Sequence, residues 1–452
     1  MSLMIPLAMF GWPLVAIALF LVLNPRDAVI ASYIGAWLFL PIAVYQIPGI
    51  PDYTKMSAAT LGALVGTFLF DAPRLIRFRP HWIDVPIILY CLWSATSSFT
   101  TGKGTWDAAS AIVEQTIDWG LPCFFGRVYF TDLKSFAELA IGIVIGGLIY
   151  VPLCLLEIRL SPQLHNWVYG YYQHSFAQTI RYGGFRPTVF MEHGLAVAMW
   201  MIIAALLAIW LRSTGALRIL AGIRFDYLVG LLLITCILCK STGALSLMLL
   251  GILALFMARG LQHSLPLMLM IAIAPAWMTG RTFDWFNGSA IFHFYEGISP
   301  ERAQSFQVRL EQEDNLLKIA KQRPFCGINR WDMTPADQLW LLLFQRFGAV
   351  GLAAFTAVFL VPAIVLLVKI PFSQLCRPEW SSLSGLVMVV VLYTLDNLAN
   401  GMTNPIFAMT AGALGSACVA DLSYERNSSR AEDTASTTSK AVRRALWPRT
   451  AV

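Results

Sequence analysis

Two arginines in the last third of the sequence have the spacing of an anion-binding pair. Arg302 and Arg309 lie seven residues apart in a segment, 301–322, whose apolar residues recur with the period of an amphipathic helix. Seven residues make about two helical turns, so the two guanidinium groups project from nearly the same face, roughly 10 Å apart. Such a pair can bind a diphosphate bidentately without a metal ion. The alternative is that both arginines pair with Glu311, Glu313 or lipid headgroups.

The apolar segment that follows begins with Asp337 and Gln338 and contains Arg346. Charged residues in an apolar helix are costly, and they usually face a cavity or a partner. We therefore expect this helix to line a substrate cleft, with Gln338 and Arg346 among its binding residues. Two roles are open for Asp337: its side chain could cap the start of the helix, or it could receive a proton as a general base.

A second group of polar residues precedes another long apolar run. Arg181 and Arg186 are substrate-binding candidates, and Glu192 and His193 form an alternative base or acceptor-binding pair. Equally open are a capping role for Glu192 and interfacial positions for the arginines, whose long side chains reach lipid headgroups. Lys240, between two further apolar runs, could add a cation to a diphosphate site or reach headgroups in the same way.

The composition indicates that membrane-spanning helices position these residues. Hydrophobic residues make up 57% of the chain and charged residues only 13%, and the mean hydropathy is +0.65. We predict an all-α, polytopic integral membrane protein with roughly 12–13 transmembrane helices. The apolar runs that support this prediction are 4–23, 28–46, 56–71, 84–98, 108–126, 135–156, 191–211, 226–240, 243–259, 262–279, 337–369, 381–397 and 405–421.

Basic residues in the short loops predict the orientation, because such loops stay in the cytoplasm. They are Arg74, Arg77, Arg79, Arg212, Arg218, Arg224, Arg259, Lys369, Arg377, Arg443 and Arg444. This assignment puts the long segments 157–190 and 280–336 on the opposite, extracytoplasmic side, within a transmembrane domain that spans 1–422. The polar segment 423–452 is expected to be a disordered cytoplasmic tail. The net charge of +6 is explained by these loops and the tail, so it gives no reason to expect nucleic acid as a partner.

The sequence gives no pattern for a metal site or another cofactor, and we expect none. Seven of the eight cysteines lie in or beside apolar runs, where packing is their ordinary role. Cys326 is the only cysteine in a segment assigned to the extracytoplasmic side, and it has no evident partner there. A zinc site would need several ligands that converge, together with a polar second shell.

The late segment resembles the conserved block of the O-antigen ligase and O-antigen polymerase family. That block has an arginine in a periplasmic helix, a Pro-x-x-Gly-x-Gly turn, and a His-Asn pair ahead of spaced leucine and glycine residues. This chain departs from it at Asn329, in place of the second turn glycine, and at Asp337 and Gln338, in place of the His-Asn pair. The matching residues are Arg309, Pro324, Gly327, Leu341, Gly348, Gly351 and Leu352.

The resemblance implies metal-independent transfer of a glycan from undecaprenyl diphosphate to an acceptor hydroxyl, at the periplasmic face of the bacterial inner membrane. In the ligases the histidine is thought to help activate the acceptor, and Asp337 occupies that position here. The implied partners are the lipid-linked glycan donor, a glycan acceptor, membrane lipids and a chain-length regulator. The missing histidine favours an O-antigen or exopolysaccharide polymerase over a ligase that transfers to lipid A core or protein.

A transporter of lipid-linked glycans is the alternative from a different functional class, since it would share the helices and a cationic cavity. Transporters commonly consist of two repeated halves with interrupted helices at matching positions. The sequence has no such repeat, and the late loop at 280–336 is asymmetric. These features favour an enzyme.

Overall fold

Nearly all regular structure in the protein is helical, as the long apolar runs require. The computed structural model describes residues 2–48, 51–286, 297, 300–328 and 337–420, and for 300–303 and 305–306 it describes the backbone alone. The predicted tail at 423–452 and the turn residue Asn329 therefore lie outside the described residues. Within them, the all-α prediction is confirmed.

The first half of the chain forms most of the short helices. Its α-helices are α1 (Met4–Val22), α2 (Pro25–Phe39), α3 (Lys55–Phe70), α4 (Ala72–Ile76), α5 (Val85–Thr100), α6 (Thr105–Gln115), α7 (Leu121–Tyr129), α8 (Leu133–Leu160), α9 (Leu164–Tyr169) and α10 (Gly194–Thr214). Short helical turns, η1 (Trp82–Asp84), η2 (Thr116–Gly120) and η3 (Phe176–Thr179), connect some of them.

The second half contains α11 (Phe225–Leu238), α12 (Thr242–Leu261), α13 (Leu265–Thr282), α15 (Pro300–Ala320), α16 (Leu339–Lys369), α17 (Phe372–Leu375), α18 (Ser381–Asp396) and α19 (Pro405–Val419). Two antiparallel hairpins are the only sheets in the described residues. They are β1 (Ile180–Arg181) with β2 (Gly184–Phe185), and β3 (Ile219–Leu220) with β4 (Ile223–Arg224).

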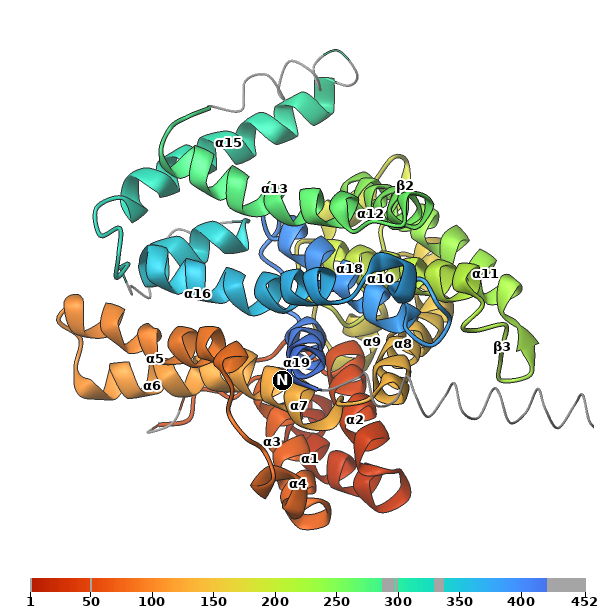
Figure 1. The fold of residues 1–452 in the computed structure, drawn as a ribbon. Coiled ribbons are helices and arrows are strands. Elements are labelled where there is room, and N and C mark those ends of the chain that lie inside the picture. The colour runs from red at the N-terminus through yellow and green to blue at the C-terminus, as the bar shows by residue number, and fades with distance from the viewer. Residues whose placement is uncertain (1, 49–50, 287–296, 298–299, 329–336, 421–452) are drawn as a thin grey trace, which may run out of the picture.

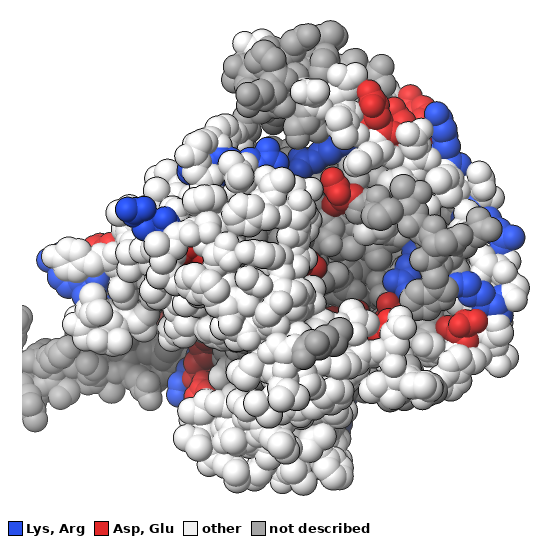
Figure 2. Space-filling model, turned by 180° about the vertical axis from the view of Figure 1, so that it is seen from behind, with Lys and Arg blue, Asp and Glu red and all other residues white. Residues whose placement is uncertain are grey.

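Several helices could cross a membrane, which indicates a multi-pass membrane protein. By length and apolar composition, five helices in the described residues qualify: α1, α8, α10, α12 and α16. The shorter helices α3, α11, α18 and α19 are also apolar. On the face shown in Figure 2, broad areas of the described surface carry no charged side chain, and charged residues gather towards the edges of these areas.

Two of the predicted spans are interrupted. The run 108–126 divides into α6, the π-helical turn η2 and α7. Helix α16 contains a break at Gly348, where φ is +69° and ψ is −172°. The turn at residues 324–328 fits into this break: the amide of Ile328 donates to the carbonyl of Gln345 (2.7 Å), and the amide of Ala349 donates to the carbonyl of Pro324 (2.7 Å). The turn that follows α15 is therefore joined directly to α16.

Helix α15 confirms the helix predicted over 301–322, and it lies beside α13 (Figure 1). A buried ion pair joins them, in which Arg281 of α13 donates to Glu313 (2.8 Å), and the same guanidinium donates to Asp314 (2.6 Å). Leu310, Leu317 and Ala320 are buried, as the amphipathic pattern predicts. Because Glu313 is engaged by Arg281, it does not neutralise Arg309, which was one of the alternatives considered for that arginine.

Candidate active site

The polar residues of three separate segments meet at one end of the helix bundle. Arg181 and Arg186 belong to the β1–β2 hairpin and the segment after it, His193 precedes α10, and Arg309 lies on α15. Both Arg186 and His193 lie within electrostatic range of Arg181 and Arg309. The structure thus brings together residues that are more than a hundred positions apart in the sequence.

The arginines of this cluster, Arg181, Arg186 and Arg309, have no carboxylate in ion-pair contact among the residues that the structure describes. Arg186 is buried, its Nη2 donates to the carbonyl of Lys240 (3.1 Å), and its Nε has no partner in the described residues. Burial lowers the pKa of Arg186 to about 10, and the neighbouring Arg181 contributes in the same direction. A cationic cluster of this kind is suited to binding an anion.

His193 is held as a neutral hydrogen-bond donor. Its Nδ1 accepts from the amide of Leu195 (3.0 Å), which caps α10, and its Nε2 lies 3.3 Å from Oε1 of Gln178. Since an amide oxygen only accepts, Nε2 carries the proton. Burial lowers the pKa of His193 to about 4, and His174, Arg186, Arg181 and Arg309 reinforce the effect. With both ring nitrogens engaged, His193 is poorly suited to act as a base.

Glu192 is the carboxylate closest to this cluster along the chain. It is partly buried, and its Oε1 makes no hydrogen bond in the described residues. Burial raises the pKa of Glu192, while Lys55 and His174 oppose that rise. Lys55, the first residue of α3, was not identified from the sequence. The available signal was a lysine at the start of an otherwise apolar helix.

The backbone before Glu192 is positioned by a second carboxylate that sequence reasoning missed. Glu157, near the end of α8, is 1% exposed. Its Oε2 accepts from the amides of Thr188 and Val189, both at 2.8 Å, and its Oε1 accepts from the amide of Leu164 (2.9 Å). The first two bonds fix the segment between Arg186 and His193, and the third holds the start of α9. An acid near the end of an apolar run was the sequence signal.

Removing this carboxylate gives a first testable prediction. The variant Glu157→Leu is expected to lower the free energy of unfolding by roughly 3 kcal/mol or more, because two buried amides and one partly buried amide lose a charged acceptor. Thermal unfolding of the detergent-solubilised protein measures the effect. The control is Glu138→Leu on the same helix, which removes a carboxylate that is 27% exposed and paired with Arg26. Equal melting temperatures for Glu157→Leu and the parent would contradict the anchoring role.

Helix α16 begins differently from the prediction. Its first amides donate to backbone carbonyls of the α18–α19 loop, Leu339 to Asn400 (3.2 Å) and Trp340 to Asn397 (3.4 Å). Asp337 is exposed and precedes Gln338, which occupies the N-cap position without a side-chain capping bond. The capping interpretation of Asp337 is therefore wrong, because other groups already satisfy those amides.

Gln338 connects α16 to the helix that carries Arg309. Its side chain is 1% exposed, and its Nε2 donates to the carbonyl of Arg309 (3.3 Å). Beside this contact, Arg309 lies within electrostatic range of Asp396 at the end of α18, where Asn400 donates to Asp396 (2.6 Å). Asn397 and Asn400 thus support the start of α16, and Asp396 adjoins the cluster.

Two other predicted binding residues, Lys240 and Arg346, make contacts that join parts of the fold to one another. Nζ of Lys240 donates to the carbonyls of Arg181 and Tyr182, each at 3.2 Å, so it supports the β1–β2 hairpin. Arg346 pairs with Glu114 of α6 (3.1 Å), on the side of α16 that faces the α5–α6 hairpin. The prediction that Arg346 faces the substrate cleft is thus not supported, because its charge joins two helices. The side chain of Arg302 lies outside the described residues.

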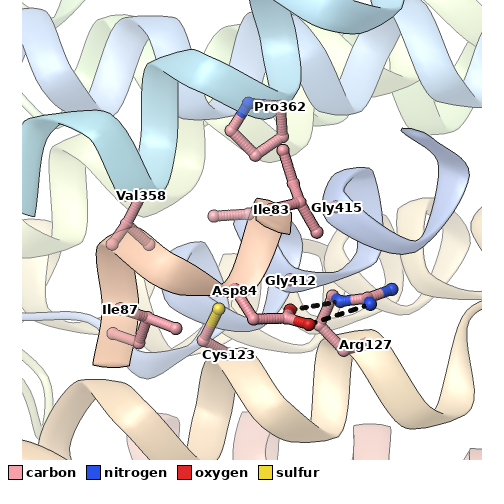
Figure 3. A pocket seen from close by; sticks show the side chains of 10 residues that line it. Ile83, Asp84, Ile87, Cys123, Arg127, Val358, Pro362, Gly412 and Gly415 are labelled. Atoms are coloured by element: carbon pink, nitrogen blue, oxygen red, sulfur yellow. Dashed lines mark hydrogen bonds and ion pairs between the residues drawn. The ribbon is translucent and has the colours of Figure 1, made fainter. Parts of the chain in front are cut away.

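A small cavity elsewhere in the fold contains another buried charge pair (Figure 3). Asp84 at the start of α5 accepts two hydrogen bonds from Arg127 of α7, at 2.6 and 3.1 Å, and both side chains are less than a tenth exposed. Ile83, Cys123 and Pro362 complete much of the lining. Because the two charges satisfy each other, we assign this pair a structural role.

The apolar helices indicate a multi-pass helical membrane protein, and its described residues include a cationic cluster that is adjacent in the chain to the partly buried carboxylate of Glu192. In the part of the chain that the structure describes, no three His, Cys, Asp or Glu residues converge as metal ligands. No protein-family model matches the sequence, and no curated protein is significantly similar to it.

Proposed function

We propose that the protein is a metal-independent glycosyltransferase that moves a glycan from an undecaprenyl-diphosphate donor to a sugar hydroxyl. The observation that carries this proposal is the convergence of Arg181, Arg186 and Arg309 at His193, with no carboxylate in ion-pair contact among the described residues. A diphosphate is the kind of anion that several guanidinium groups bind well. The motif resemblance around Arg309 supports the same substrate class.

The proposed location is the periplasmic face of the bacterial inner membrane, in a protein with about 12–13 crossings. Helix α10 supports this orientation. It has 21 residues and is therefore about 30 Å long, the thickness of a bilayer core. His193 precedes its first residue, whereas Arg212 and the basic hairpin β3–β4 lie at its other end. The cationic site and the basic loop thus lie at opposite ends of one membrane-length helix.

The proposed reaction needs three contributions from the protein. The acceptor oxygen forms a bond to the anomeric carbon of the donor, while the bond from that carbon to the phosphate oxygen breaks. The bonding electrons leave with the lipid diphosphate, whose charge the arginines stabilise. The site also orients the two substrates. A carboxylate, Asp337 or Glu192, receives the acceptor proton.

Incubation of purified protein with an undecaprenyl-diphosphate oligosaccharide tests this function. A polymerase lengthens the lipid-linked glycan, which mass spectrometry detects, and it works together with a chain-length regulator. A ligase produces new product only when lipid A core or a protein acceptor is added. A transporter instead moves the lipid across proteoliposomes without changing its mass, and that result would overturn the proposal.

Chelation of metal ions provides a further prediction. Transfer by the purified protein is expected to be unchanged in excess EDTA, because guanidinium groups rather than a divalent cation stabilise the leaving diphosphate. The rate of product formation with and without EDTA is the measurement. A loss of activity that added magnesium or manganese restores would contradict the arginine mechanism.

A further inference from the structure

We propose that Glu192 is the group that receives the acceptor proton, and that Lys55 is the positioning residue that keeps this carboxylate ionised. The inference rests on the proposed function and adds to it a residue from α3, a helix that the sequence motifs do not include. Its basis is a pair of opposite charges: Lys55 is buried, Glu192 is partly buried, and neither Nζ of Lys55 nor Oε1 of Glu192 makes a hydrogen bond in the described residues.

Lys55 is an unusual lysine in this fold. It is only 8% exposed, and its ammonium makes no hydrogen bond in the described residues. The Nζ atom lies 3.8 Å from the centre of the Trp37 ring, a cation–π contact that partly replaces lost hydration. A buried ammonium is costly unless it is paired. The charge that compensates it therefore has to come from a nearby anion.

Glu192 is that anion. Each group lies within electrostatic range of the other, although they are not in ion-pair contact. The Oε1 atom of Glu192 is buried and has no partner in the described residues, while the residue as a whole is partly exposed. One side of the residue can therefore be reached from solvent, and its unpaired oxygen can still accept a hydrogen bond.

The other groups around Glu192 fit a proton acceptor at the edge of an anion site. His174 of the preceding loop and Tyr393 of α18 also lie within its electrostatic range. The ring of His174 lies 4.6 Å from that of His193, centre to centre, and His193 is near Arg186 and Arg309. Glu192 is thus connected to the arginine cluster through His174 and His193.

The proton balance of the step is simple. As the acceptor oxygen bonds to the anomeric carbon, its proton passes to the carboxylate of Glu192, which becomes a neutral carboxylic acid. The acid then returns the proton to solvent before the next turnover. Lys55 favours the ionised form of the carboxylate, so that it is ready to accept. Neither residue changes oxidation state, and no further reactant is required.

Two variants of the purified full-length protein test the assignment. Glu192→Gln keeps the shape of the side chain but cannot accept the proton, so transfer is expected to fall by roughly 100-fold or more. Lys55→Met removes the ammonium and thereby raises the pKa of Glu192. The acidic limb of the pH–rate profile should then move to higher pH, by roughly one unit or more, whereas Lys55→Arg should keep it near that of the parent.

The controls distinguish this inference from the proposed function. Glu311→Gln makes the same chemical change on the exposed face of α15, and it should transfer at the parental rate. Thermal unfolding checks that each variant is folded, and Glu192→Asp, which retains a carboxylate, should recover part of the activity. A parent protein that transfers no glycan would overturn the proposed function and this inference with it.

If the parent protein transfers glycan, two results would contradict the roles assigned to Glu192 and Lys55 without contradicting the proposed function. One is a fully active Glu192→Gln, above all if Asp337→Asn loses transfer, because the proton would then pass to Asp337. The other is an acidic limb that does not move in Lys55→Met.

Discussion

Replacing Arg309 by alanine is expected to lower glycan transfer by roughly 100-fold or more, the scale of losing one electrostatic contact to a developing anion. Arg309 adds to the charge of the cluster around His193, and its backbone carbonyl is held by Gln338. The side chain itself forms no ion pair in the described residues. Its removal should therefore weaken donor binding and leaving-group stabilisation without breaking an internal salt bridge.

Arg309→Lys separates the role of charge from that of geometry. Lysine keeps the positive charge but lacks the planar fork that binds two phosphate oxygens, so transfer should still fall by roughly 10-fold. Arg224→Lys is the matched control, since Arg224 is an exposed arginine of the β3–β4 hairpin at the other end of the bundle. Transfer assays on protein with parental expression and melting temperature measure both effects. Parental activity of Arg309→Ala and Arg309→Lys together would exclude the diphosphate site.

The helices themselves were largely predictable from the sequence, because long apolar runs leave the backbone few other choices in a bilayer. The runs 191–211 and 405–421 correspond closely to α10 and α19, and the amphipathic segment 301–322 corresponds to α15. The interruption at η2 was not predictable. Its sequence, Thr-Ile-Asp-Trp-Gly, contains no proline that would mark an interruption, and a π-helical turn depends on the helices packed around it.

The candidate site was only partly predictable. Arg186 and Arg309 were identified separately from local patterns, but their proximity depends on how α15 packs beside α13 and α16. Lys55 and Glu157 were missed because their partners lie far away in the sequence. The capping role considered for Asp337 failed for the same reason, since the carbonyls that cap α16 belong to the α18–α19 loop. Local spacing identifies residue types, whereas tertiary packing decides which of them meet.

The break in α16 explains why the motif has glycine at positions 327 and 348. The φ of +69° and ψ of −172° of Gly348 lie in a region that is essentially restricted to glycine. A Cβ atom at this position would also lie 2.3 Å from the backbone carbonyl of Phe325. Gly327, in the turn, has a φ of +73° and approaches the backbone of Arg346 equally closely. The two glycines allow the turn and the helix break to interlock.

Gly348→Ala is therefore expected to destabilise the protein by roughly 3 kcal/mol or more, since neither the backbone conformation nor the contact can be retained. Transfer should fall as well, because the turn at residues 324–328 connects the helix of Arg309 to α16. Gly230→Ala in α11 is the control: a Cβ there meets nothing within 4 Å, and alanine favours a helix. Thermal unfolding and transfer are measured on both variants. A Gly348→Ala protein with parental stability would show that the turn is not held in the break, and the interlocking of the two motif glycines would have to be abandoned.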